Sequence, residues 1–343
     1  MISIFTICSN NYLAQASVLA ASVAQHCPEV RFEVYLVDLP FAEIKYEDLP
    51  FNVVFINEIE NDIEELLTRY DIIELNTCVK PKIFQHICSD PEITQAVYLD
   101  PDIKLFDALT NLYIAFEQYS ILLTPHILTP IPIDDKWPLE QQFLNYGLYN
   151  LGFIGIKNDT TGRGFLAWWK ERTYKLGYSR VAEGLFVDQL PVNFAPIFFD
   201  RVHVLKDLGY NMGPWNLHER MLTVVAGHIM VNEKTSLKFF HFSSFKINSG
   251  ELPLHYYSRF TLNDRLDLRE IYQQYNNDLI SADYAKYSSI PCAYVSRRQE
   301  LQTSLEGKSQ NAPSFLTKCL RTSVRLLPSS VRLKLKDLFM HTT

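Results

Sequence analysis

Two aspartates separated by one residue stand at the end of a short apolar segment, in Tyr98-Leu99-Asp100-Pro101-Asp102. Carboxylate oxygens are the ligands that hard divalent cations prefer, and a site with few protein ligands leaves positions open for phosphate oxygens. Chance alone gives about one Asp-x-Asp in a chain of this length, so the spacing by itself is weak evidence. The position of the pair, at the end of an expected strand, is what favours a metal site.

A histidine late in the chain could complete such a site. His241 stands among aromatic residues, in Phe239-Phe240-His241-Phe242, and Lys246 follows it. A neutral imidazole can join two carboxylates on a metal ion, and a lysine can meet a diphosphate as a point charge. A histidine with aromatic neighbours is also a common core residue, and that alternative stays open.

The segment Ser9-Asn10-Asn11-Tyr12 follows the first apolar run, where nucleotide-binding α/β folds place a nucleotide. Amide side chains can hydrogen-bond to the edge of a base, and a tyrosine can stack on its face. Serine and asparagine are also preferred at helix N-termini, so capping is the alternative role for this segment.

A second polar and aromatic segment runs from Gly209 to Arg220. Trp215 could stack on a sugar ring, and polar side chains around it could hydrogen-bond to hydroxyls or phosphate: Asn211, Asn216, His218 and Arg220. A loop packed by its own tryptophan explains the same composition equally well.

Strand-like and helix-like segments alternate in the first half of the chain, which predicts an α/β domain with a mostly parallel sheet and flanking helices. We expect strands at 2–8, 32–39, 52–56, 96–99, 120–124, 151–156 and 238–242. We expect helices at 12–26, 74–88 with the helix proper starting near Pro81, 165–174 and 266–279. The predicted organisation is a catalytic domain over 1–250, a helical extension packed on it over 251–302, and a tail over 303–343.

Composition excludes several classes of protein. The 343 residues are 47% hydrophobic and carry a net charge of −7, which indicates a globular protein and argues against nucleic-acid binding. No run of about 18 apolar residues predicts a membrane span. The six cysteines have no Cys-x-x-Cys spacing and the N-terminus lacks a basic region, so we expect reduced thiols and a cytoplasmic location.

The tail differs in charge from the rest of the chain. From Gly307 to Thr343 it holds seven lysines and arginines and one aspartate, interspersed with Leu, Val and Phe. A basic amphipathic helix of this kind binds anionic membrane surfaces, which predicts peripheral contact with the inner face of the plasma membrane. A helix docked on the body of the protein and a protein–protein contact are the alternatives.

Several motifs occur together in one order: the segment 4–38, Thr77 to Lys80, the Asp100-Pro101-Asp102 group, Tyr149 to Gly152, Asp188-Gln189 and His241. As an ordered set they resemble the retaining glycosyltransferases of family eight and their bacterial polysaccharide-synthesis relatives, over about residues 1–250. The resemblance implies a GT-A fold, a Rossmann-type sheet that binds nucleotide-diphosphate sugars. Ser9 and Asn10 depart from it, since family members commonly have acidic residues there.

The resemblance also implies roles for single residues. Contacts to the donor nucleotide, its phosphates and its sugar fall to Thr6, Ser9, Asn10, Asn11, Tyr12, Lys80, Asp100, Asn150 and Lys246. A bound Mn²⁺ or Mg²⁺ is held by Asp100, Asp102 and His241. Asp188 and Gln189 lie beside the reacting centre.

The function expected from these features is transfer of a sugar from a nucleotide-diphosphate donor, a UDP-sugar by resemblance, to a glycan or lipid-linked glycan in the synthesis of a surface polysaccharide such as lipopolysaccharide or capsule. The resemblance implies retention of the anomeric configuration, although Asp188 acting as a general base would invert it. Two alternatives stay open: a nucleotidyltransferase, which would want a glycine- and arginine-rich loop after the first strand, and a sugar-nucleotide-binding homologue without catalysis.

Overall fold

A seven-stranded sheet forms the centre of the computed structural model, which describes residues 1–247 and 257–310. In spatial order its strands are β10 (Val202–Val204), β6 (Ile121–Pro125), β7 (Tyr149–Lys157), β4 (Gln95–Leu99), β1 (Ile2–Cys8), β2 (Arg31–Leu36) and β3 (Asn52–Phe55). Strand β7 runs antiparallel to both of its neighbours, and every other adjacent pair is parallel. The predicted α/β class with a mostly parallel sheet is confirmed.

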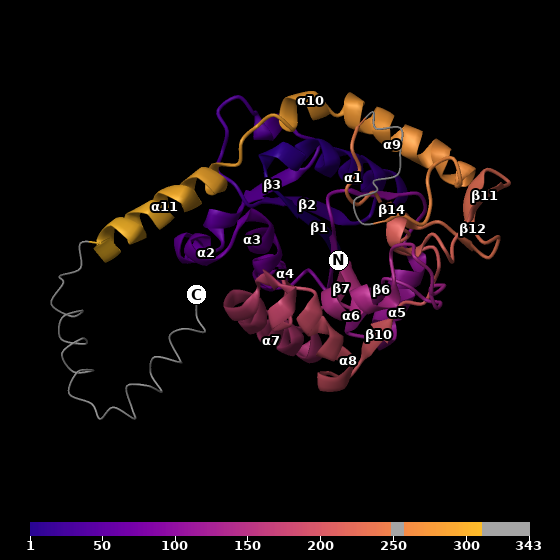
Figure 1. Cartoon of the computed structure of the whole chain (residues 1–343), viewed down its shortest axis with the longest axis horizontal. Helices are drawn as coiled ribbons and strands as arrows, with labels where there is room; N and C mark the ends of the chain where they lie inside the picture. The colour runs from indigo at the N-terminus through magenta and orange to yellow at the C-terminus, as the bar shows by residue number, and fades with distance from the viewer. Residues whose placement is uncertain (248–256, 311–343) are drawn as a thin grey trace. The chain divides into compact units, whose positions relative to one another are not determined.

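Helices cover both faces of this sheet, with α1 on one side and α4 and α7 on the other (Figure 1). On the first face, Ile4 of β1 belongs to one buried cluster with residues of α1 (Leu13–His26) and α5 (Thr110–Gln118). On the second, the ring of Phe5 lies 4.7 Å from that of Phe84 in α4 (Lys80–Ile87), which in turn contacts Trp169 of α7 (Thr160–Leu176). Neighbouring residues of β1 therefore point to opposite cores, as a strand buried on both faces requires.

Smaller elements surround the sheet. Three short sheets consist of β5 (Ile103–Leu105) with β14 (Phe239–His241), β8 (Ser179–Arg180) with β9 (Leu185–Phe186), and β11 (Leu222–Val225), β12 (His228–Val231) and β13 (Thr235–Ser236). The remaining α-helices are α2 (Ile63–Arg69), α3 (Ile72–Cys78), α6 (Glu140–Tyr146), α8 (Ala195–Phe198), α9 (Arg269–Ser281), α10 (Tyr284–Tyr287) and α11 (Ala293–Gln310). Short 3₁₀ helices lie at Asn10–Tyr12, Tyr46–Asp48, Ile56–Glu58, Val181–Glu183, Leu190–Phe194, Pro214–Asn216 and Leu266–Leu268.

The helix expected over 74–88 is two helices in the structure. Asp71 caps α3 with its carboxylate, which accepts from the backbone N–H groups of Ile73 and Glu74. The Glu74 carboxylate in turn accepts from the backbone N–H of Asp71. This reciprocal cap starts a helix earlier than the apolar pattern indicates. Pro81 lies in the first turn of α4, the position that suits it.

The strand expected over 32–39 ends at Leu36 because the chain turns at a buried aspartate. The carboxylate of Asp38 accepts hydrogen bonds from the backbone N–H groups of Asn10, Leu39 and Ala293, at 3.2, 2.9 and 2.8 Å. These bonds tie the end of β2 to the loop after β1 and to the start of α11. Asp38 therefore braces the edge of the sheet where the predicted ligand-binding loop lies.

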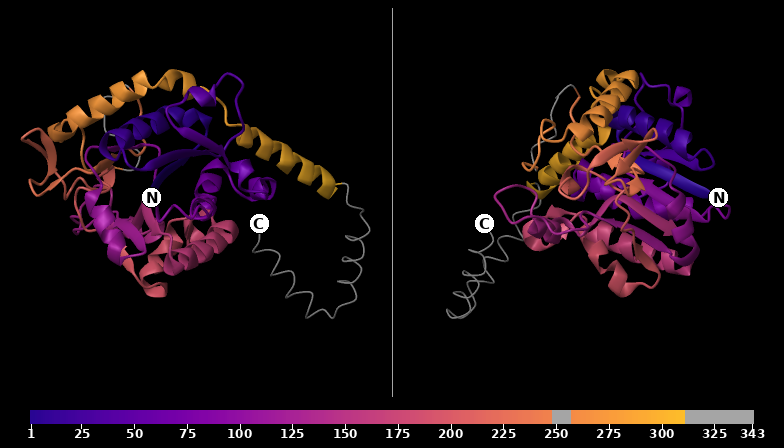
Figure 2. Two further views of the ribbon diagram at one scale, coloured as in Figure 1. Left: turned by 180° about the vertical axis from the view of Figure 1, so that it is seen from behind. Right: turned by 90° about the vertical axis from the view of Figure 1, so that its right-hand side faces the viewer.

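Chain contacts group residues 1–298 into one compact unit. Within it, α9 and α10 contact α1, and both views in Figure 2 show α9 running beside α1. The predicted division at residues 250 and 302 stays a prediction, and the basic tail from residue 311 on lies outside the described residues. Over 1–247 and 257–310, no helix is both long and apolar enough to cross a bilayer.

Candidate functional site

The carboxyl ends of β1 and β4 meet at one edge of the sheet because these strands are parallel neighbours. Ser9 to Tyr12 follow β1, and Asp100 to Asp102 follow β4. The backbone N–H of Ile103 donates to the carbonyl of Asp100 at 3.1 Å, which closes a turn with Pro101 at its second position. Proline favours that position because its fixed φ matches the turn. The turn places both carboxylates at the strand end, where ligands of open α/β sheets gather.

Strand pairing brings His241 to these carboxylates. After the turn the chain enters β5, and β14 pairs with it so that His241 lies opposite Ile103. The Nε2 atom of His241 is 2.9 Å from Oδ1 of Asp102 and 3.5 Å from Oδ2 of Asp100. One ligand atom from each of the three side chains lies within 4.8 Å of the others. The three residues predicted as metal ligands therefore form one cluster, which could hold a divalent cation.

The donor set of this cluster fits Mn²⁺. Two carboxylates and an imidazole combine the oxygen ligands of hard cations with a nitrogen that Mg²⁺ rarely takes. Burial lowers the pKa of His241, but the charges of Asp102 and Asp100 outweigh that effect and raise the pKa above its ordinary value. A proton and a metal ion would therefore compete for Nε2 of His241, the ring nitrogen that faces both carboxylates.

Tyr98 orients one of the carboxylates. Its hydroxyl donates to Oδ1 of Asp100 at 2.5 Å, which leaves Oδ2 turned toward His241. Residues that fix a metal ligand in this way contribute to metal affinity although they do not touch the ion. The sequence analysis did not assign a role to Tyr98, although its position two residues before Asp100 on a strand puts both side chains on the same face.

Gly152 of β7 gives His241 the room it occupies. A Cβ atom at position 152 would lie 2.5 Å from Cε1 and 2.7 Å from Nδ1 of His241, and 2.8 Å from Oδ1 of Asn150. The carbonyl of Gly152 also accepts from the backbone N–H of Asp100 at 2.8 Å. Only glycine fits this position without a shift of the histidine ring, which gives a physical reason for the glycine in the Tyr149 to Gly152 motif.

A buried ion pair lies beneath the cluster. Nζ of Lys80 is 2.7 Å from Oδ2 of Asp188, and both side chains are 3% exposed. The same Nζ donates to the carbonyl of Leu151 at 2.9 Å and sits 4.1 Å from the centre of the Tyr98 ring. Burial raises the pKa of Asp188, Lys80 opposes that effect, and the net shift is upward. The charge of Lys80, predicted to meet donor phosphates, is matched by Asp188 in this structure.

Both the oxygen and the nitrogen of the Gln189 side-chain amide form hydrogen bonds with the backbone. Its Oε1 accepts from the N–H of Leu151 at 2.9 Å, and its Nε2 donates to the carbonyl of Tyr146 at 2.7 Å. Asn150 is bonded in a similar way, since its Oδ1 accepts from the N–H of Gly152 at 3.1 Å. These amides hold the start of β7 beside the cluster.

In the loop after β1, the side chains of Ser9 and Asn10 bond within the protein, whereas those of Asn11 and Tyr12 line a pocket. Oγ of Ser9 donates to the carbonyl of Val37, and the Asn10 amide bonds to the carbonyl of Leu39 and the hydroxyl of Tyr46. Ser9 makes no side-chain cap. The side chains of Ser9 and Asn10 already have partners within the protein, and their contact with a nucleotide stays a prediction. Thr6 is fully buried within β1. Asn11 and Tyr12 face a pocket.

That pocket has a volume of about 240 Å³ and adjoins the cluster through Asp102. The loop after β1, the end of β14 and the helices α9 and α10 supply its walls. Its lining residues are Asn11, Tyr12, Gln15, Asp102, Phe242, Ser244, Phe245, Tyr275, Leu279, Tyr284 and Ser288. Lys246 follows this lining and its side chain is exposed.

The segment 209–217 reaches the cluster through its tryptophan. The Trp215 ring meets that of His241 edge-on, with centroids 5.2 Å apart. Asn216 is fully buried and donates to the carbonyls of His126 and Asn211 at 3.0 Å each. Asn211, at a φ of 53°, donates to Oγ1 of Thr124 at 3.0 Å. Both asparagines therefore shape the loop, and Trp215 is the member of the predicted sugar pocket that touches the cluster.

The other two members of the predicted sugar pocket bond to backbone elsewhere. Arg220 is buried and donates to the carbonyls of Leu208 and Tyr210 at 3.0 and 2.6 Å. Nε2 of His218 lies 3.2 Å from the carbonyl of Thr129. The structure does not bring these two side chains to the metal-ligand cluster.

His126, which the sequence analysis did not assign, lies in the site. Its ring stacks on Phe143 at 4.9 Å, meets Trp215 edge-on at 5.7 Å, and its Nε2 is 3.3 Å from Nδ2 of Asn150. Burial lowers the pKa of His126 to about 4, so the ring is neutral. Its place just after a strand was the sequence signal, and a surface histidine would have fitted that signal equally well.

Comparisons with known proteins give distant similarities. No known protein-family profile matches the chain. Two uncharacterized proteins of Bacillus subtilis (strain 168) are each 26% identical to it: YfnF, over 71% of this chain and 82% of YfnF, and YfnD, over 79% of this chain and 86% of YfnD.

Solved structures of glycosyltransferases are similar to the chain at low identity. The galactosyltransferase LgtC in complex with donor and acceptor sugar analogs has 16% identity and a TM-score of 0.46, over 86% of this chain and 99% of LgtC. The glycosyltransferase GlyE of Streptococcus pneumoniae TIGR4 has 15% identity and a TM-score of 0.45, over 85% of this chain and 65% of GlyE.

Proposed function

We propose that this chain is a metal-dependent glycosyltransferase of the GT-A type, which transfers a sugar from a nucleoside-diphosphate donor, with UDP as the expected nucleotide. The observation that carries the proposal is the cluster of Asp100, Asp102 and His241, which opens onto a pocket of about 240 Å³ at the carboxyl edge of the sheet. A nucleoside diphosphate needs its phosphates neutralised and a place for its nucleoside, and this arrangement offers both side by side.

The residues around the cluster suit a leaving group that carries negative charge. A cation held by Asp100, Asp102 and His241 would supply Lewis-acid stabilisation of the diphosphate. Tyr98 keeps Asp100 oriented, Gly152 leaves room for the His241 ring, and Trp215 packs edge-on against that ring. Each supporting contact holds a ligand side chain in position before a substrate arrives, which is where electrostatic catalysis gains most.

We propose further that the sugar and the acceptor bind on the side of the cluster where Asn150, His126 and Trp215 meet. The acceptor we propose is a glycan or lipid-linked glycan of a surface polysaccharide, and the reaction retains the anomeric configuration. Asp188 is the carboxylate that would invert the configuration if it acted as a general base, but it forms a buried ion pair with Lys80. The configuration of the new glycosidic bond, read by proton NMR and compared with that of the donor sugar, separates retention from inversion.

A thermal-shift titration with UDP, GDP and CMP, each with and without Mn²⁺, tests the proposal. A ligand that binds only the folded protein raises its melting temperature, by an amount set by concentration over Kd. We expect stabilisation by UDP that requires Mn²⁺ and that disappears in Asp102→Asn, which keeps the shape of the side chain but removes its charge. No shift with any nucleotide would contradict the proposal.

Turnover assays distinguish the proposed transferase from the two alternative functions. Hydrolysis of a UDP-sugar in the presence of Mn²⁺, lost in Asp102→Asn, supports a transferase. Tight binding of UDP and Mn²⁺ without any hydrolysis or transfer, across a panel of UDP-sugars and glycan acceptors, would indicate a sugar-nucleotide-binding protein instead. Formation of a nucleotide sugar from UTP and a sugar phosphate would indicate a nucleotidyltransferase.

A further inference from the structure

We propose that the helix pair α9 and α10 completes the donor pocket, and that the hydroxyl of Tyr275 donates a hydrogen bond to a ribose or phosphate oxygen of the bound nucleotide. The inference rests on the proposed function, since it assigns a contact within the same pocket. It adds residues of the chain's last described third to a site that the sequence placed within residues 1–250.

Tyr275 is a buried residue whose hydroxyl has no hydrogen-bond partner among the described residues. The side chain is 1% exposed, yet it lines the pocket that adjoins Asp102. Buried hydroxyls are nearly always hydrogen-bonded, and one left without a partner costs free energy. The hydroxyl oxygen is itself covered in the structure, so a polar ligand in the pocket would supply the missing acceptor once the atoms over it move aside.

The ring of Tyr275 is fixed against the strand that carries the histidine of the cluster. It stacks on Phe242 with centroids 3.9 Å apart and an interplanar angle of 5°. Phe242 follows His241 directly, and its backbone N–H donates to the carbonyl of Asp102 at 2.9 Å. The phenol therefore holds a set position relative to the proposed metal ligands.

Burial keeps the Tyr275 hydroxyl protonated, so it can donate a hydrogen bond. Burial, followed by the charge of Asp102, raises the pKa of Tyr275 well above its ordinary value, so the oxygen keeps its proton. A protonated phenol can donate to the oxygens of a phosphate or a ribose, which accept hydrogen bonds. Tyr12 and Tyr284 line the same pocket and offer aromatic surface to a base.

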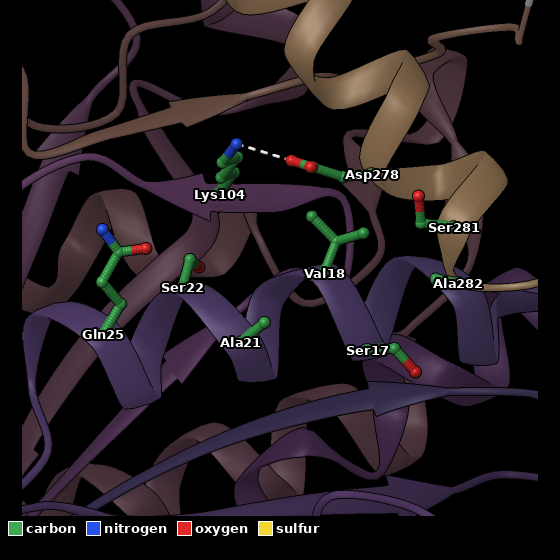
Figure 3. Close-up of a pocket in the computed structure, with 9 residues that line it drawn as sticks. All are labelled: Ser17, Val18, Ala21, Ser22, Gln25, Lys104, Asp278, Ser281 and Ala282. Atoms are coloured by element: carbon green, nitrogen blue, oxygen red, sulfur yellow. Dashed lines mark hydrogen bonds and ion pairs between the residues drawn. The ribbon is translucent and has the colours of Figure 1, made fainter.

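An ion pair holds α9 in register with the cluster. Nζ of Lys104, two residues after Asp102, lies 2.5 Å from Oδ2 of Asp278, one turn of helix after Tyr275. Figure 3 shows this pair bridging from β5 to α9 across a hollow whose other wall is the face of α1 that carries Ser17, Ala21 and Gln25. The wall that Tyr275 belongs to is therefore tied to β5, the strand that follows the metal-ligand turn.

The same helix offers a matched control. Tyr272 lies one turn before Tyr275, is 3% exposed, and its hydroxyl likewise has no hydrogen-bond partner among the described residues. Unlike Tyr275, it is absent from the lining of the pocket. Removal of either hydroxyl relieves a buried polar atom, but only one of the two atoms could meet a nucleotide.

The test is calorimetric titration of the full chain with UDP, and separately with GDP and with uridine, at saturating Mn²⁺. We expect Tyr275→Phe to weaken binding of UDP about 10-fold, the effect of one lost hydrogen bond to a charged group, while its melting temperature without ligand stays equal or rises. Tyr272→Phe should leave the Kd within about twofold of the wild type. Loss with UDP and uridine alike would place the contact at the ribose, and loss with UDP alone at a phosphate.

Three results would overturn the inference. If the wild type binds UDP with Mn²⁺ and Tyr275→Phe binds it equally well, the hydroxyl makes no contact and the proposed function still stands. If Tyr275→Phe and Tyr272→Phe lose affinity equally, the effect comes from the helix and not from the pocket. A wild type that binds no nucleotide at all would overturn the proposed function together with this inference.

Discussion

Replacement of Gly152 by alanine tests whether the His241 ring is held where the proposed metal site needs it. The added Cβ would lie 2.5 Å from Cε1 and 2.7 Å from Nδ1 of that ring. An ordinary carbon–carbon contact is about 3.5 Å, so the ring or the strand must move by about 1 Å. His241 is 5% exposed and has Trp215 on one side, so the ring has little free space to move into.

The size of the effect follows from how narrowly metal sites tolerate displacement. Ligand distances in protein metal sites hold within about 0.2 Å, and a shift of about 1 Å removes His241 from the ligand set. We expect the Mn²⁺ affinity of Gly152→Ala to fall by about 10- to 100-fold, the range seen when the support of a metal ligand is lost. Overpacking should cost about 1–3 kcal/mol of unfolding free energy as well.

Isothermal titration with Mn²⁺ and urea denaturation measure the two effects separately. Gly164→Ala is the control, because a Cβ there meets nothing within 4 Å and position 164 lies in helix α7. That substitution should stabilise the protein by about 1 kcal/mol and leave Mn²⁺ affinity unchanged. Wild-type Mn²⁺ affinity in a folded Gly152→Ala protein would refute the reasoning, because the ring would then be either mobile or irrelevant to the metal.

Two further predictions concern buried titratable side chains. His126 has a pKa of about 4 in the folded protein, below its ordinary 6.5, so the unfolded chain binds a proton that the folded one does not. Its contribution to stability should therefore be lost as pH falls, by about 2 kcal/mol between pH 7 and pH 5 in urea denaturation, and His126→Gln should flatten that dependence. Asp188→Asn leaves the charge of Lys80 buried and should cost about 3 kcal/mol of unfolding free energy, whereas the double variant with Lys80→Met should cost less than the sum of the single changes. An additive double-mutant cycle would mean that the two side chains do not interact.

The parts of the fold that follow from local pattern were predictable from the sequence. The segment 2–8 consists of apolar residues apart from Ser3 and Thr6, and it forms β1 over the same residues. The Asp100-Pro101-Asp102 turn was predictable for a related reason, since proline and aspartate directly after an apolar strand favour a turn. Because parallel strands end at one edge, the meeting of this turn with the loop after β1 followed from the α/β class.

The contacts that give each polar side chain its role were not predictable, because they join residues far apart in the chain. Ser9 and Asn10 have the composition of a base-contacting loop, but their polar atoms bond to backbone at the end of β2 and to Tyr46. Lys80 has the composition of a phosphate ligand, but its charge meets Asp188. The sequence shows which side chains can donate or accept hydrogen bonds, but the tertiary fold determines which partners they meet.

The charges gathered around β4 explain why the folded chain should favour a divalent cation. Asp100, Asp102 and Asp188 contribute three carboxylates to this region, and Lys80 supplies one fixed positive charge, which is already paired with Asp188. The two remaining carboxylates share His241, whose pKa they raise against the effect of burial. One imidazolium proton leaves an excess of negative charge in a half-buried place, and excess buried charge is costly unless something compensates it. A doubly charged ion held there in place of that proton would balance the two carboxylates, and under the proposed function it would bring the phosphates of a nucleotide to the mouth of the pocket that Tyr12 and Tyr275 line.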